Sequence, residues 1–322
     1  MAGLSVAAVI PTHNRADLLG RAIESALSQS SPPDEVIVVD DGSTDDISSV
    51  VRRYGGSVRL TRKPRGGVGS ARNLGVAISE ADFVAFLDSD DYWDDSYIDS
   101  INRAIAATDR AALLYFCDLR LSEQRGGQTI WERCGFSISG PHEFRRDALD
   151  WLLMPRQPLM IPASVIRRDA YLDVGGSSER LPRRSDTHLF FKIGLSGPLC
   201  AVAGIAGEAT SDDRDSLSYA VTADDPAYLD CTTWLYSDLL GRMSGRSRHE
   251  RSAVSKRLAG AHWSLVRRGA IGPASRVLHL AFAVRNEPGI IPRRLGRLIG
   301  RRLHAFASSR RKPNGRRGGA AV

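Results

Sequence analysis

The stretch Phe83-Val84-Ala85-Phe86-Leu87-Asp88-Ser89-Asp90-Asp91 places three carboxylates within four positions, directly after five apolar residues. The apolar run predicts a buried β-strand, and the end of such a strand is where an α/β sheet presents its ligands. Adjacent negative charges repel one another, and a hard divalent cation is the usual way to neutralise them. The stretch therefore predicts a metal site suited to a diphosphate. The alternative is a solvated turn in which Asp91 caps the next helix.

The composition is that of an ordinary globular chain. Its 322 residues are 42% hydrophobic and 25% charged, which suits one large domain or one domain with an appendage. The sequence shows no apolar run of about 18 residues and no basic segment at its start, so we expect neither a membrane span nor a secretory signal. The four cysteines form no CxxC pair, which favours free thiols over a zinc site. These features predict a cytoplasmic protein.

Positive charge is concentrated near the C-terminal end. Residues 285–317 contain eleven Arg or Lys and one acidic residue, so the rest of the chain carries −3 of the total net charge of +7. Residues 290–306 alternate apolar and Arg side chains at helical spacing, a pattern typical of a helix that lies on an anionic membrane. The same stripe could instead pack on the protein's own body. We expect no specific nucleic-acid partner, because charge alone supports only non-specific binding.

Strand-like and helix-like segments alternate through the N-terminal half. Strands are expected at 6–10, 35–39, 58–61 and 83–87, and helices at 16–29, 43–54 (capped by Ser43 or Thr44) and 70–79. This alternation predicts an α/β fold with a mostly parallel central sheet flanked by helices. Further on, the pattern indicates a strand at 112–116, a helix at 186–195 and two or three amphipathic helices within 225–285. Residues 122–146 show no periodic pattern.

Four motifs follow the expected strands: Pro11-Thr12-His13-Asn14-Arg15, Val39-Asp40-Asp41-Gly42-Ser43-Thr44-Asp45, Gly69-Ser70-Ala71-Arg72-Asn73 and Leu87-Asp88-Ser89-Asp90-Asp91. In this order and spacing they resemble the family 2 glycosyltransferases, which have the GT-A fold. The resemblance implies a GT-A domain over residues 1–220, with a nucleotide-sugar half at 1–115 and an acceptor half at 116–220. A helical C-terminal region at 221–307 and a disordered basic tail at 308–322 complete the expected organisation.

The resemblance also implies roles for individual residues. Nucleotide-sugar binding falls to Pro11, Thr12, Asn14, Arg15, Asp40, Asp41, Arg72, Asn73, Asp88 and Arg214. Asp41 would accept the uracil N3–H, which favours a UDP-sugar as donor. Asp88 and Asp90 would form the DxD pair that holds Mg²⁺ or Mn²⁺, with Asp90 as the direct ligand. Residues 67–72 also match part of the dinucleotide fingerprint GxGxxG, but they lack the third Gly and follow the third strand, which argues against a dehydrogenase.

An inverting transferase needs a carboxylate that deprotonates the acceptor hydroxyl. In the family this carboxylate belongs to a Glu-Asp pair that opens a helix after a Gly-Gly turn. Here Gly175-Gly176 is followed by Ser185-Asp186, so the resemblance implies Asp186 as the catalytic base, with Ser185 where Glu is usual. The alternative is that Asp186 serves only as the N-cap of its helix.

The combined expectation is a metal-dependent, non-processive hexosyltransferase. It would move a single sugar to a hydroxyl acceptor, such as a lipid-linked saccharide, in cell-envelope or exopolysaccharide assembly, or to a small metabolite. Neither the QxxRW motif of processive synthases nor a membrane span is present in the sequence. Two alternatives remain: a nucleotidyltransferase acting on sugar phosphates, which would normally begin with a Gly-rich loop, and a catalytically inactive nucleotide-sugar-binding protein, which the missing Glu keeps open.

Overall fold

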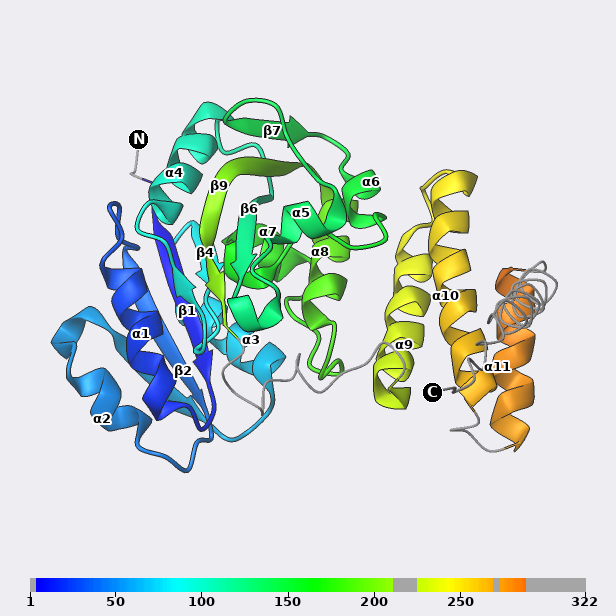
Figure 1. The fold of residues 1–322 in the computed structure, drawn as a ribbon, viewed down its shortest axis with the longest axis horizontal. Helices are drawn as coiled ribbons and strands as arrows, with labels where there is room; N and C mark the ends of the chain where they lie inside the picture. The colour runs from blue at the N-terminus through cyan, green and yellow to red at the C-terminus, as the bar shows by residue number, and fades with distance from the viewer. Residues whose placement is uncertain (1–3, 211–224, 269–272, 288–322) are drawn as a thin grey trace, which may run out of the picture. The chain divides into compact units, whose positions relative to one another are not determined.

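The structure is a computed structural model that describes residues 4–210, 225–268 and 273–287. The chain divides into two compact units, residues 1–245 and residues 246–322 (Figure 1). The described part of the first unit contains the β-sheet and the helices up to α9 (Pro226–Arg242), and that of the second contains α10 and α11. The structural division thus lies after α9, whereas the predicted functional boundary at residue 220 stays a prediction.

One sheet organises the first unit. Its strands are β1 (Val6–Thr12), β2 (Glu35–Asp41), β3 (Arg59–Lys63), β4 (Phe83–Phe86), β5 (Tyr92–Trp93), β6 (Leu114–Leu121), β7 (His142–Arg145), β8 (Ser164–Arg167) and β9 (Leu199–Ala209). They lie in the order β3-β2-β1-β4-β8-β6-β9-β5, and β7 pairs with β9. The first four strands of this order are parallel, whereas β8 runs antiparallel to both of its neighbours. The α/β class is confirmed, and the whole sheet is mixed: β6 and β9 also pair in parallel, whereas β5 and β7 run antiparallel to β9.

The helices of this unit are α1 (Ala16–Leu27), α2 (Ile47–Arg52), α3 (Val68–Ile78), α4 (Tyr97–Ala107), α5 (Ile130–Cys134), α6 (Leu149–Leu152), α7 (Arg168–Asp173), α8 (Ser185–Ser196) and α9, with short 3₁₀ turns η1 (Gly55–Ser57), η2 (Glu123–Arg125) and η3 (Ile161–Ala163). Helix α2 begins later than predicted because Asp46, and neither Ser43 nor Thr44, caps it by accepting a hydrogen bond from the Ser49 amide at 2.9 Å. Residues 122–146 form η2, α5 and β7, although the hydrophobic pattern of this segment predicted no helix or strand.

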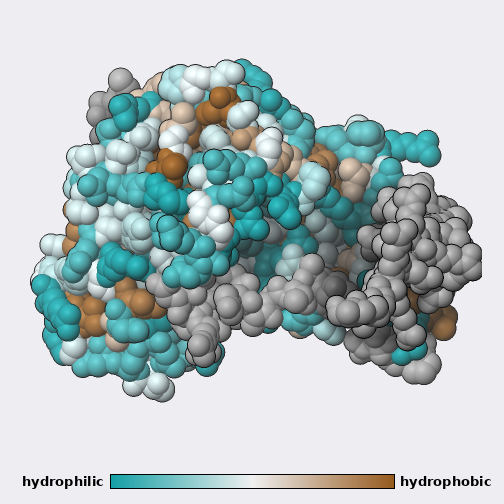
Figure 2. All heavy atoms as spheres, viewed as in Figure 1, coloured by the Kyte–Doolittle hydropathy of each residue, from teal (hydrophilic) through white to brown (hydrophobic). Residues whose placement is uncertain are grey.

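The core lies between the sheet and its helices. Every residue of β1 is buried, and Leu19 and Ile23 of α1 pack against this strand's face without exposure to solvent. Helix α3 approaches the sheet so closely that a Cβ on Gly75 would lie 2.3 Å from Val9 Cγ1. On the face shown in Figure 2, hydrophilic side chains predominate and apolar ones gather only in small patches. The close α3–β1 contact fixes the first turn of α3 near the ends of the parallel strands.

The described part of the second unit is a pair of packed helices. These are α10 (Arg248–Arg268) and α11 (Pro273–Asn286), between which Ala259 and Ala283 are fully buried and Trp263 is half-buried. With α9 they make three helices within 225–285, as the sequence pattern indicated. No helix among the described residues combines the length and the apolar character that a membrane span requires. Residues 290–306 and 308–322 lie outside the described residues.

Candidate functional site

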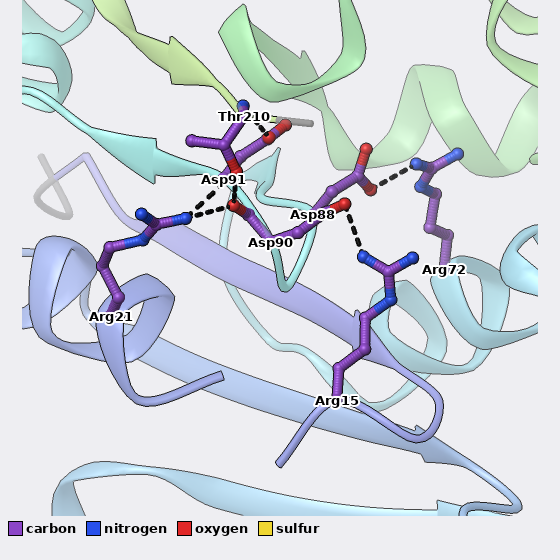
Figure 3. A network of polar contacts seen from close by, with 7 residues as sticks. All are labelled: Arg15, Arg21, Arg72, Asp88, Asp90, Asp91 and Thr210. Carbon is purple, nitrogen blue, oxygen red and sulfur yellow. Dashed lines mark hydrogen bonds and ion pairs between the residues drawn. The ribbon is translucent and has the colours of Figure 1, made fainter. Parts of the chain in front are cut away.

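The predicted site residues of the N-terminal half come together where the parallel strands end. Strands β1, β2 and β4 run in the same direction, so the residues that follow them meet at one edge of the sheet. The first turn of α3 joins them there. Figure 3 shows the aspartate cluster, defined as Asp88, Asp90 and Asp91, with arginines on both sides.

Each of the two expected metal ligands is paired with an arginine that was expected to bind the nucleotide. Arg72 Nη2 lies 2.7 Å from Asp88 Oδ1, and Arg15 Nη1 lies 2.5 Å from Asp90 Oδ2 (Figure 3). Burial and the negative charge of Asp88 raise the pKa of Asp90, and the ion pair with Arg15 only partly offsets them. The cluster therefore holds its own counter-ions, and it gains from any further positive charge.

Asp91 has a structural role, and its alternative role as a helix cap is wrong. Its Oδ1 accepts a hydrogen bond from the Thr210 amide at 2.9 Å, whereas Ser96 occupies the N-cap position of α4. Burial and the charges of Asp88 and Asp90 raise the pKa of Asp91 well above its usual value. The side chain thus ties the end of β9 to the loop after β4.

Arg21 and Thr210 complete the cluster and were missed by the sequence reasoning. Arg21 Nη2 donates to the carbonyl of Asp90 at 2.6 Å and to Thr210 Oγ1 at 3.0 Å, and the Thr210 hydroxyl donates to the same carbonyl. Arg21 is separated in sequence from Asp90 by 69 positions and from Thr210 by 189, so no local pattern could indicate these contacts. They fix the backbone of Asp90 from two sides.

Asp41 sits in a cradle of donors at the end of β2. Lys63 Nζ and the Gly66 amide donate to Oδ1, both at 2.8 Å, and the Gly67 amide donates to Oδ2 at 2.7 Å. Burial disfavours the charge, but these hydrogen bonds and the charge of Lys63 outweigh it and lower the pKa of Asp41. Asp41 is therefore an ionised acceptor, and Lys63 is a third residue, after Arg21 and Thr210, that no motif had indicated.

The motif at residues 11–15 is hydrogen-bonded to the motif at residues 39–45. Asn14, in the left-handed region with φ 52°, donates through its amide to Ser43 Oγ at 3.0 Å and accepts from the Thr44 amide at 2.7 Å. Asp40 accepts from the Ser43 amide at 2.8 Å, which shapes the same turn. Thr12, like Pro11 before it, is buried at the end of β1, and its hydroxyl has no partner among the described residues.

Asn73 connects α3 to the turn that precedes the expected base. Its Oδ1 accepts from the Ser177 amide and from the Tyr171 hydroxyl, both at 2.8 Å, and its Nδ2 donates to the Ser177 carbonyl and to Glu179 at 3.0 Å. Gly69 allows the approach, since a Cβ there would lie 2.9 Å from the Ser178 carbonyl oxygen. The contacts of Asn73 are therefore within the protein, and its role toward a nucleotide sugar stays a prediction.

Asp186 lies in the first turn of α8 and is half-buried. Its carboxylate accepts from the amide of Thr187 at 2.6 Å, and no group outside α8 in the described part of the chain hydrogen-bonds to it. The N-cap position belongs to Arg184, so Asp186 is not the cap of its helix. The carboxylate is left available for chemistry. Arg214 lies outside the described residues.

The residues of the aspartate cluster suit a hard divalent cation, but they do not enclose one. No group of three or more His, Cys, Asp or Glu side chains that could hold a metal occurs in the described ranges. Asp88 and Asp90 offer carboxylate oxygens, the ligands that Mg²⁺ and Mn²⁺ prefer, and the Asp88 side chain is 31% exposed. The fit is to a cation that takes its remaining ligands from a diphosphate and water.

Comparisons with known proteins bear on the family and on the fold. A model of the family described as "Glycosyl transferase family 2" matches residues 7–172, which is more than half of the chain. An uncharacterized glycosyltransferase of Rickettsia prowazekii is 26% identical over 195 residues, which are 58% of this chain and 58% of the relative. This chain thus matches little more than half of the relative's length.

Two solved structures share the fold. The structure of S. aureus TarS 1–349 in complex with UDP-GlcNAc has a TM-score of 0.61 and 18% identity, and the match covers 89% of this chain and 91% of that one. The mannosyltransferase PcManGT from Pyrobaculum calidifontis, in complex with GDP-Man and Mn²⁺, has a TM-score of 0.56 and 17% identity, covering 89% and 86%. The GT-A fold implied by the four motifs is confirmed.

Proposed function

We propose that this chain, which belongs to glycosyl transferase family 2, transfers a single sugar from a UDP-sugar to a hydroxyl acceptor with inversion at the anomeric carbon. The observation that carries the proposal is the double pairing of Asp88 with Arg72 and of Asp90 with Arg15. Aspartates alone would indicate a cation site and arginines alone a phosphate site. Interleaved at one sheet edge, they suit a diphosphate that arrives together with Mg²⁺ or Mn²⁺.

The cradle around Asp41 supports uracil as the base of the donor. The carboxylate is ionised and already holds three donors, yet Oδ2 accepts only one of them. A carboxylate oxygen can accept a second hydrogen bond, here from the uracil N3–H. Guanine also offers a ring N–H, and the structurally similar PcManGT was solved with GDP-Man, so the nucleotide has to be tested directly.

Asp186 is the proposed general base. It would take the proton of the acceptor hydroxyl while that oxygen attacks the anomeric carbon, and the leaving diphosphate would be stabilised at the aspartate cluster when the metal is bound. Its half-buried carboxylate has no hydrogen bond beyond its own helix in the described part of the chain. A base needs such a lone pair free at the moment of reaction.

A thermal-shift panel tests the donor assignment. UDP, GDP, UDP-GlcNAc, UDP-glucose and GDP-mannose are each added with Mn²⁺, with Mg²⁺ or with EDTA, and Tm is recorded. A ligand that binds only the folded protein raises Tm, so we expect a metal-dependent rise with UDP and one UDP-sugar. The Asp88→Asn variant serves as the matched control and should lose the metal dependence. A rise with GDP compounds alone would contradict the uracil assignment.

Product analysis separates the two enzyme classes. A glycosyltransferase releases the nucleoside diphosphate, whereas a nucleotidyltransferase acting on a sugar phosphate releases pyrophosphate. We expect UDP without pyrophosphate from the donor that the panel selects. Pyrophosphate would establish the nucleotidyltransferase, and donor binding without either product would favour the inactive binding protein.

Charge is divided unequally between the two units, which bears on the acceptor. Residues 246–322 contain nineteen Arg or Lys and two acidic residues, which gives them a net charge of +17. Because the whole chain has a net charge of +7, the net charge of residues 1–245 is −10. Such asymmetry favours binding of the C-terminal unit to an anionic surface. We place the protein at the cytoplasmic face of a membrane, with residues 290–306 in contact with lipid and a lipid-linked saccharide as acceptor.

Vesicle flotation tests this placement. The full chain should float with vesicles that contain phosphatidylglycerol and stay behind with pure phosphatidylcholine, and rising salt should weaken the binding. Replacing Arg294, Arg297 and Arg301 by Glu should abolish flotation while leaving the donor-induced rise in Tm unchanged. Equal flotation with both vesicle types, or none with either, would contradict the proposal.

A further inference from the structure

The residue that leads into α8 has an unusual backbone. Arg184, two positions before Asp186, has φ 63° and ψ 18°, in the left-handed region. It is one of four non-glycine residues with positive φ in the described part of the chain. Glycine adopts this conformation freely, but an L-residue with a side chain does so at an energetic cost. Other contacts must therefore hold Arg184 in place.

Those contacts come from one face of α9. Arg184 Nη1 donates to Thr232 Oγ1 at 2.8 Å, and Nη2 lies 3.3 Å from the Tyr236 hydroxyl. The guanidinium carbon lies 5.2 Å from the centre of the Tyr228 ring and 5.4 Å from that of Tyr236. The three α9 residues are four positions apart, so they form a single stripe along the helix. Together they enclose the guanidinium between two aromatic rings and a hydroxyl.

One further ion pair and one histidine–carboxylate hydrogen bond join the same segments on either side. Arg183 pairs with Asp225, the N-cap residue of α9, and His188 Nε2 lies 2.8 Å from Asp238 Oδ2 near the other end of the helix. Arg242 Nε also lies 2.6 Å from this Asp238 oxygen. The start of α8 is thus attached to α9 at three successive levels, and Arg184 is the middle one.

We propose that Arg184 is a positioning residue for the catalytic base, and that α9 acts as the brace that holds it. The proposal rests on the proposed role of Asp186. Because the carboxylate of Asp186 has only the neighbouring amide as a hydrogen-bond partner in the described part of the chain, its place is set by the backbone at the start of α8. Arg184 fixes the direction in which the chain enters that helix. The brace lies beyond residues 7–172, the part that the family model matches.

The test uses the full chain and the slow hydrolysis of UDP-GlcNAc with Mn²⁺, or of the nucleotide sugar that shifts Tm most, with water as acceptor. Arg184→Ala should lower kcat about 10- to 100-fold, the loss expected for a misplacement near 1 Å. KM for the donor and the donor-induced rise in Tm should stay as in the unchanged protein. Arg184→Gly should lose less, because glycine adopts the left-handed conformation without cost.

Arg180→Ala is the matched control. Arg180 lies over the ring of Trp234 on the same helix, with 5.2 Å between the guanidinium carbon and the ring centre, but it is exposed and does not lead into α8. The kcat of Arg180→Ala should stay within about twofold of that of the unchanged protein. Should Arg184→Ala fail to fold, Thr232→Val combined with Tyr236→Phe removes both hydrogen-bond partners and leaves Arg184 in place. That variant should lower kcat several-fold.

A double variant shows whether Arg184 acts through the base. In an Asp186→Asn background, Arg184→Ala should cause no further loss, since effects that act through one group do not add. An equal fold-loss in both backgrounds, or an unchanged kcat for Arg184→Ala beside an inactive Asp186→Asn, would overturn the positioning role alone. Full turnover of Asp186→Asn would overturn the base assignment, and with it this proposal.

Discussion

The two halves of the candidate site treat their carboxylates in opposite ways. At the ends of the parallel strands, Asp88 and Asp90 are each paired with an arginine, and Asp41 is surrounded by donors. At the start of α8, Asp186 has one local hydrogen bond, and the arginine beside it contacts α9. In the first arrangement each carboxylate is paired with a cation or donors that offset part of its charge, whereas in the second the carboxylate accepts one local hydrogen bond in the described part of the chain.

This difference follows from what each half would have to do. A binding site for a charged donor has to be stable when empty, and internal ion pairs supply that stability. A base has to remain unprotonated and unpaired until the acceptor arrives, so its position is best fixed through the backbone. Changing one group in each half, and comparing donor binding with turnover, tests whether the two halves act separately.

The largest effect is expected from Asp186→Asn. Loss of a general base costs about 10²- to 10⁴-fold in rate, and the donor-induced rise in Tm should remain because the donor half is untouched. Donor turnover and Tm are measured on the same preparation, with Ser185→Ala as the neighbouring control, expected to stay within about twofold. If Asp186→Asn abolished donor binding as well, the separation of the two halves would be wrong.

Asp90→Asn should affect binding and turnover together. Removing a carboxylate from the cluster weakens the site for a divalent cation, so we expect on the order of 10²-fold lower kcat/KM and a higher Mn²⁺ requirement. Titration of activity with Mn²⁺ measures both. Asp82→Asn, at a surface ion pair with Arg110, is the control and should leave the titration unchanged. An unaltered Mn²⁺ requirement in Asp90→Asn would remove this residue from the metal site.

Gly75→Ala tests the support beneath the donor half. A Cβ there would lie 2.3 Å from Val9 Cγ1, so the substitution should lower the free energy of unfolding by about 1–3 kcal/mol, as overpacking does. Gly241→Ala is the matched control, because nothing lies within 4 Å of a Cβ at that position of α9. It should stabilise by roughly 0.5–1 kcal/mol. Urea unfolding measures both, and equal effects would contradict the close α3–β1 packing.

The smallest effect, a pH dependence, is expected from Asp91→Asn. Because burial and the charges of Asp88 and Asp90 raise the pKa of Asp91, the folded state binds a proton more tightly than the unfolded state. Stability from this group is present at low pH and is lost as pH rises through the raised pKa. Asparagine can still accept from the Thr210 amide. In EDTA, the variant should melt a few degrees higher at pH 7.5, and the difference should vanish near pH 4. A lower Tm at pH 7.5 would contradict this.

Local patterns predicted the donor half well because its residues follow strands whose order is simple. The apolar runs before Pro11, Asp40 and Asp88 placed the three strand ends, and parallel pairing then brought them together. Arg21 and Lys63 were missed because their partners lie on other elements, and neither belongs to a motif. The segment 122–146 was unreadable since α5 and β7 are each only a few residues long.

The sequence predicted which residue would be the base, but not the contacts that fix the start of α8. Asp186 was found through the resemblance, yet nothing in the sequence shows that Arg184 adopts a left-handed conformation or that α9 encloses its guanidinium. Arginine is not a residue from which positive φ is expected. Tertiary contacts over about fifty positions decide this backbone, and such contacts have no local signature.

The pairing of Arg15 with Asp90 and of Arg72 with Asp88 has a consequence for inhibitors. An anion that binds alone can pair with the two arginines only if Asp88 and Asp90 lose their ion-pair partners. A cation that binds alone to the aspartates leaves the arginines without theirs. A ligand that brings both charges lets the four side chains exchange partners without leaving any of them isolated. Uncharged mimics of a diphosphate should therefore bind weakly here, however well their shape agrees, whereas compounds that carry a chelated metal have an entry route.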